Sequence, residues 1–239
     1  MISSLDVIPS ERNERDVLRL HLVFGLVVVA VLALPGSTPA WGVRIFLLLV
    51  AYDTAALILA VRRGHGRWLQ DLSVLMPLSA LQIFPDWFLS AGLGILVFPD
   101  ATFPKIGTVT AYMALMWTVP LFLIVQVARA VEDRDLWGPG RPARRGLARV
   151  AAALTAALLF ITSEATFWRL DLWQAVNVQQ VGHVALYVVL PEIILGVAAY
   201  EACHWAAGRR WRAKAAAALT VMWIYLGTLA FFYLLIEVV

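Results

Sequence analysis

Seven long apolar segments, separated by short polar stretches, run along the 239-residue chain. A helix needs about 20 mostly apolar residues to cross the hydrocarbon core of a bilayer. The segments are close to that length or longer, so the pattern predicts an all-α integral membrane protein with seven transmembrane helices. The predicted spans are residues 18–34, 41–61, 72–97, 108–131, 147–167, 181–206 and 215–239.

The basic residues lie almost entirely in alternate links between these spans. Of the 19 lysines and arginines, all but Arg44, Lys105 and Arg169 fall on the side that holds the N-terminus. Because basic loops stay in the cytoplasm, we expect the N-terminus inside, the C-terminus outside, and the protein in the inner (plasma) membrane. Residues 1–17 are then a cytoplasmic N-terminal segment, and residues 18–239 form a single transmembrane domain.

The composition agrees with this pattern. Hydrophobic residues make up 62% of the chain and charged residues 15%, against about half and about a quarter in soluble domains. This balance excludes a soluble globular enzyme, a disordered chain and a nucleic-acid-binding module. The single cysteine and the four scattered histidines give no metal-ligand spacing, and no nucleotide-binding motif occurs. We therefore expect no metal, no cofactor and no nucleic-acid partner. The frequent alanine, arginine and tryptophan are typical of a GC-rich bacterium.

Two of the spans begin alike, which indicates an internal repeat. Residues 106–113 match residues 181–188, and each copy has a tyrosine five positions after a glycine. Ten positions after that glycine come Trp117 in one copy and Glu192 in the other. We expect parallel helical hairpins, made by spans three and four and by spans five and six, with a site at their interface. Chance similarity between apolar segments is the alternative.

Six acidic residues fall inside the predicted spans, and two of them, Glu201 and Glu237, lie toward span ends. The other four have few basic residues available to pair with them: Asp53, Asp86, Glu164 and Glu192. An acidic side chain at the bilayer centre costs about 2.5–3.5 kcal/mol. These carboxyls must therefore face one another or a cavity, and we expect some of them to be protonated. A structural role is the alternative, because Asp86 and Glu192 each follow a proline and can accept hydrogen bonds from backbone N–H groups at a helix break.

A protonated carboxyl in an apolar pocket suits general acid catalysis on a weakly basic substrate such as an alkene. Aromatic faces nearby stabilise the cation that forms. We therefore take Glu192, Asp86, Glu164 and Asp53 as candidate catalytic residues. The candidate substrate-binding residues are Phe84, Trp87, Tyr112, Trp117, Tyr187 and Trp223.

The second copy of the repeat resembles the membrane lycopene cyclase domain of carotenoid synthesis. The resemblance rests on Trp173, the glycine-led run of residues 181–192 ending in Pro191 and Glu192, and a Tyr-Glu pair at residues 200–201. The family carries a second acid after the proline that this chain lacks. Over the run of residues 75–79 leading to Asp86, the chain also looks like small seven-span terpene cyclases that make meroterpenoids.

Both resemblances imply the same chemistry and the same partner. A carboxylic acid in the membrane protonates the alkene or epoxide of a hydrophobic isoprenoid drawn from the lipid bilayer, and the carbocation cyclises without redox change. Glu192 is the residue that maps onto the first family's motif and Asp86 the one that maps onto the second. Two alternatives use the same acids: a proton-coupled carrier of small molecules, and a non-catalytic membrane subunit whose acids pair with basic residues of a partner.

Overall fold

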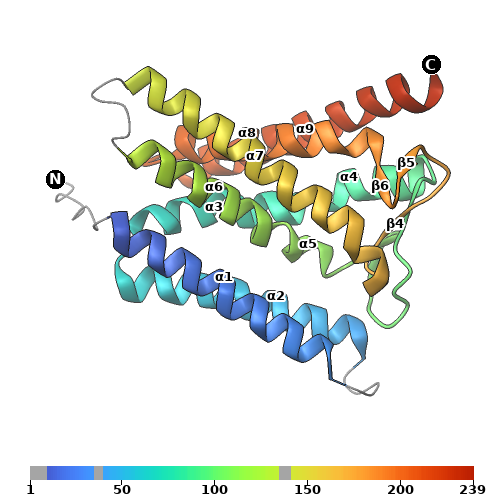
Figure 1. The fold of residues 1–239 in the computed structure, drawn as a ribbon, viewed down its shortest axis with the longest axis horizontal. Coiled ribbons are helices and arrows are strands. Elements are labelled where there is room, and N and C mark those ends of the chain that lie inside the picture. Colours follow the sequence, from blue (N-terminus) through green and yellow to red (C-terminus); the bar gives the residue numbers. More distant parts are fainter. Residues whose placement is uncertain (1–9, 35–39, 135–140) are drawn as a thin grey trace.

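The computed structural model describes residues 10–34, 40–134 and 141–239, and they fold almost entirely into helices (Figure 1). Residues 1–9 of the predicted N-terminal segment lie outside this description. The long helices are α1 (Ser10–Leu32), α2 (Trp41–Arg63), α3 (Gly66–Leu81), α6 (Thr118–Asp133), α7 (Arg141–Phe167), α8 (Leu186–Ala206) and α9 (Trp211–Tyr233). The short helical elements are α4 (Ile83–Trp87), η1 (Phe88–Gly92), α5 (Met113–Met116), η2 (Trp168–Leu170) and η3 (Leu234–Val238).

Six helical segments are long and apolar enough to cross a membrane, so the fold is that of an all-α, multi-pass membrane protein. They are Trp41–Arg63, Gly66–Gly92, Met113–Asp133, Arg144–Leu170, Leu186–Ala206 and Trp211–Val238. The first of the seven predicted spans falls within α1, which is not among them. The reason lies in its sequence, because Arg15, Asp16 and Arg19 occupy its first half and only its second half is apolar.

Six short strands form three antiparallel pairs in the links between helices. The strands are β1 (Leu96–Val97), β2 (Lys105–Ile106), β3 (Val109–Thr110), β4 (Gln174–Ala175), β5 (Gln180–Val181) and β6 (Val184–Ala185). The pairs are β1 with β4, β2 with β3, and β5 with β6. The strands β4 to β6 and the C-terminus lie at one end of the molecule, and the N-terminal end of α1 lies at the other (Figure 1).

The two segments aligned as a repeat fold in the same way. Each forms a hairpin with a two-residue turn, and the register of Ile106 with Val109 is the same as that of Val181 with Val184. The turn glycines have φ values of +63° and +65°, a left-handed conformation that glycine adopts without strain. The prediction that helices begin at residues 108 and 181 was therefore wrong, because apolar hairpin strands extend the apolar runs. The helices themselves start at Met113 and Leu186.

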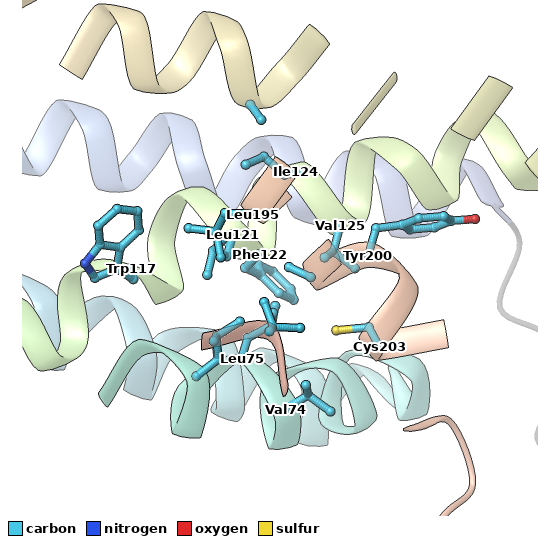
Figure 2. Close-up of a cluster of buried hydrophobic side chains, with 14 of the residues drawn as sticks. Val74, Leu75, Trp117, Leu121, Phe122, Ile124, Val125, Leu195, Tyr200 and Cys203 are labelled. Atoms are coloured by element: carbon cyan, nitrogen blue, oxygen red, sulfur yellow. The ribbon is translucent and has the colours of Figure 1, made fainter. Parts of the chain in front are cut away.

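Most of the core is a single apolar cluster between α3, α6, α8 and α9. Figure 2 shows Trp117 at one end of this cluster and Tyr200 and Cys203 at the other, with Leu121 and Phe122 between them. The cluster is held by the packing of α8 along α9 and α7, and of α3 along α9 and α6. Buried polar groups lie at both ends of this cluster: Asp71 and Arg129 near Cys203, and a group of carboxyls near Trp117.

Candidate active site

A cavity of about 280 Å³ lies between the helices on the Trp117 side of the core. Its lining comes from α1, α2, α4 to α9 and the segments at the hairpin end, and it is mostly aliphatic and aromatic. Three of the four candidate acids line it: Asp86 from α4, Glu164 from α7 and Glu192 from α8. Elements far apart in the sequence thus bring three carboxyl groups to one apolar space.

The three carboxyls differ in their hydrogen bonds. Glu164 accepts a bond of 2.7 Å from the indole nitrogen of Trp173. Asp86 accepts a longer bond of 3.5 Å from the indole nitrogen of Trp117. One oxygen of Glu192, Oε2, is buried and has no hydrogen-bond partner among the described residues. Glu192 is therefore the cavity acid with a buried oxygen that no described donor satisfies.

The described lining residues include no lysine or arginine. The one basic side chain among these residues is that of His21 in α1, and both of its ring nitrogens have hydrogen-bond partners. Nδ1 donates to the carbonyl of Val17 at 2.9 Å, and Nε2 lies 2.9 Å from the hydroxyl of Tyr52. Among the described residues no group of three or more His, Cys, Asp or Glu side chains is placed to hold a metal ion. The three carboxyls thus share a space lined mainly by aliphatic and aromatic side chains, with no lysine or arginine among its described residues.

The repeat explains how two of the facing residues reach the cavity. Trp117 and Glu192, which lie at equivalent positions after the two hairpins, both line it. Both residues stand ten positions after the turn glycine, but Trp117 lies between α5 and α6, whereas Glu192 lies inside α8. A tryptophan in one copy and a carboxyl in the other give the site an unlike pair of groups.

The candidate aromatic residues fall into two groups. Trp117 and Tyr187 line the cavity. Tyr112 is buried outside it, beside Phe103 at a ring separation of 5.6 Å. Phe84, Trp87 and Trp223 were also expected at the site, but they do not line the cavity. They lie on the outer surface of the bundle, where they are 56%, 49% and 59% exposed.

Asp53 also lies away from the cavity. It is buried in α2, and neither carboxyl oxygen has a hydrogen-bond partner among the described residues. The sequence predicted that this residue is enclosed, but a single sequence does not reveal which cavity a buried side chain faces.

Sequence reasoning missed several lining residues. Phe160 and Ser163 precede Glu164 on α7 at spacings of four and one, and Phe160 and Tyr225 pack on Trp117 at ring separations of 5.5 and 5.6 Å. The helical spacing from Glu164 was a usable signal for Phe160. No pattern in the sequence singled out Tyr225, which comes from α9.

The fold and site define a multi-pass helical membrane protein with a carboxyl-lined internal cavity. The chain belongs to the family described as a domain of unknown function, DUF6989, whose model matches residues 83–236. That region contains Asp86, Glu164 and Glu192 and both repeat hairpins, whereas α1 to α3 precede it. No curated protein matches the chain. No solved structure matches it either.

Proposed function

We propose that the chain is an integral membrane enzyme that cyclises an isoprenoid without redox change, with Glu192 as the proton donor. The observation that carries the proposal is the convergence of three carboxyls and several aromatic rings on one apolar cavity. Acid-initiated alkene chemistry needs a proton donor sheltered from water and faces that stabilise a cation. The cavity combines both requirements.

The hydrogen bonds support a division of roles among the carboxyls. An indole N–H only donates, so it favours a carboxyl oxygen that accepts. Trp173 and Trp117 give Glu164 and Asp86 such donors, whereas Oε2 of Glu192 has none among the described residues. Glu192 is therefore assigned the proton, and Glu164 and Asp86 are assigned the roles of cation stabiliser and final base.

The proposed reaction conserves atoms and charge. The proton of Glu192 adds to one carbon of an alkene, and the electrons of that double bond form the new C–H bond. A second double bond of the same chain attacks the resulting cation and closes a ring. Glu164 or Asp86 then removes a proton next to the final cation, which restores a double bond, and proton exchange with solvent returns that carboxyl and Glu192 to their starting states. With an epoxide the proton goes to oxygen, the C–O bond breaks, and the product is an alcohol of equal mass. In the related hydratase reaction, water attacks the final cation and gives one proton to Glu164 or Asp86, so the product is heavier by one water.

The proposal includes seven spans in a bacterial plasma membrane, with the N-terminus in the cytoplasm. The span added to the six helical segments given above is α1, which packs on α2 and α6. Its charged first half meets the basic link that follows α6, where Arg134 donates to Glu14 at 2.6 Å, and basic links favour the cytoplasmic side.

The test is expression in a bacterial host that makes lycopene and linear polyprenyl diphosphates. Lipid extracts are compared by chromatography and mass spectrometry with those of Glu192→Gln and of Glu237→Gln. Glu237 is a matched control, because it lies outside the cavity and accepts from the backbone of Gln179. We expect a new product of equal mass, or one heavier by one water, that is absent with Glu192→Gln and present with Glu237→Gln.

Full product formation by a folded Glu192→Gln variant would contradict this mechanism. A proton-coupled carrier predicts a different result: solute uptake into liposomes that follows an imposed pH gradient, with the solute chemically unchanged.

A further inference from the structure

The walls of the cavity are unequally enclosed. Lining side chains on α2, α4, α8 and α9 are buried, whereas those on α1, α6 and α7, Phe160 apart, are only partly buried. The cavity therefore has a closed floor and a more open side. We place the open side between α1 and α7, since each of them packs against α6 and their described residues make at most a slight contact with each other.

The side of α1 that faces this opening is a helical stripe. His21, Phe24, Val28 and Leu32 line the cavity at spacings of three and four residues, which places them on one face of the helix. The opposite face is exposed and apolar, as at Leu26, which is 71% exposed. In a membrane-spanning bundle such a face contacts lipid.

On α7, the rim of the opening consists of hydrophobic side chains and a serine whose hydroxyl bonds to its own helix. Leu159 and Phe167 are hydrophobic, and the hydroxyl of Ser163 donates to the carbonyl of Leu159 at 2.8 Å. At these positions the rim offers hydrocarbon and a satisfied hydroxyl, which leave water no unpaired partner there. A hydrocarbon chain finds there the same surroundings as in the bilayer.

We infer that the gap between α1 and α7 is a lateral mouth, which admits the hydrocarbon chain of a membrane-dissolved lipid to the three carboxyls. The mouth is defined by Phe24 and Val28 on one side and by Leu159 and Ser163 on the other. The ligand enters with an apolar end first, because the rim holds no group to receive a charged head. The inference deepens the proposed function and rests on it for the identity of the chain as an isoprenoid, but lipid entry is measurable without turnover.

The test uses the full chain in vesicles of a phosphatidylcholine whose acyl chain ends in a photoactivatable diazirine. After irradiation, mass spectrometry maps the adducts. We expect adducts on peptides that contain the deep lining residues Trp117 and Tyr225, in addition to outward residues such as Leu26. If adducts in the wild-type protein were confined to lipid-facing residues such as Leu26, the proposal of a lateral mouth would be wrong.

Two substitutions on α1 locate the entry. Val28→Trp narrows the mouth, and Leu26→Trp adds the same ring on the lipid-facing side of the same helix. We expect deep adducts to fall severalfold with Val28→Trp and to persist with Leu26→Trp, while outward adducts stay unchanged in both. Equal deep labelling in both variants would contradict entry between α1 and α7.

Ser163→Leu is the second variant, and it narrows the opposite rim if Val28→Trp does not fold. Labelling of the deep lining residues without product formation would support lateral lipid entry and contradict the proposed cyclase activity. Product formation without labelling of the deep lining residues would support the cyclase activity and contradict lateral entry between α1 and α7.

Discussion

Two buried acidic regions on opposite sides of the apolar core are built in contrasting ways. Beyond the Tyr200 and Cys203 end of the core (Figure 2), both oxygens of Asp71 are paired. Arg129 donates to them at 2.5 and 2.9 Å, and Gln126 donates at 3.0 Å. On the Trp117 side, three carboxyls share a cavity whose described lining contains no lysine or arginine.

The contrast indicates what each region is for. The buried ion pair engages both oxygens of Asp71, and it fixes α3 against α6. A carboxyl with a free oxygen in an apolar cavity contributes little to holding helices together. Unpaired acids in a membrane are therefore explained better by function than by stability.

The largest expected effect is on stability, and it comes from the paired region. Asp71→Asn leaves the guanidinium of Arg129, whose side chain is 6% exposed, without its counter-charge. Breaking such a pair costs about 3–5 kcal/mol, and we expect that loss in the free energy of unfolding, measured in mixed detergent micelles. Glu192→Gln, which breaks no ion pair among the described residues, serves as the control and should unfold like the wild type.

A double variant sharpens the interpretation of that pair. In Asp71→Leu with Arg129→Met, no charge remains buried at this point. Replacing a buried pair by apolar side chains is often nearly neutral, so we expect the double variant to be more stable than either single variant. Additive losses in the thermodynamic cycle would show that the two side chains act independently.

A smaller effect is expected at the cavity. Trp173→Phe removes the indole donor that bonds Glu164 at 2.7 Å, and hydrogen bonds to charged groups contribute about 1.5–3 kcal/mol. Trp117→Phe removes a bond of 3.5 Å to Asp86 and should cost less, because hydrogen bonds weaken with distance. Unfolding measurements on both variants, with product yield alongside, check this order. The reverse order would mean that the two indoles do not act as donors in this way.

The smallest effect is expected at an exposed pair. Arg67 lies 2.6 Å from Asp133, with side-chain exposures of 52% and 36%. Exposed ion pairs contribute about 0–1 kcal/mol, so Arg67→Gln should leave the unfolding curve almost unchanged. A loss as large as that of Asp71→Asn would erase the distinction between buried and exposed charge in this protein.

The sequence predicted the helical membrane fold and brought four acids forward as a group, because acids are rare and costly at that depth. Of these, Asp86, Glu164 and Glu192 line the cavity and Asp53 does not. It did not reveal Asp71 and Arg129 as partners. Both lie near helix ends, where charges are ordinary, and 58 positions separate them in the chain. Pairing of that kind depends on how helices pack, which local pattern does not encode.

The aromatic residues teach a related lesson. In a soluble protein, Phe84, Trp87 and Trp223 would be expected inside, but in this bundle they face outward. Because lipid is as apolar as the core, hydrophobicity does not tell the two faces of a membrane helix apart. The two-residue turns after Ile106 and Val181 were readable, since glycine in such a position is a hairpin signal.

The most direct test of the central claim is deuterium incorporation in D₂O. Membrane vesicles carrying the protein and a linear polyprene such as lycopene are incubated in D₂O, and the cyclised product is analysed by mass spectrometry. If Glu192 exchanges with solvent and then protonates the alkene, the product gains one deuterium at the protonated carbon, and the Glu192→Gln variant forms no such product. A cyclised product that carries no deuterium, or one that the folded Glu192→Gln variant forms with the same label, would contradict the account.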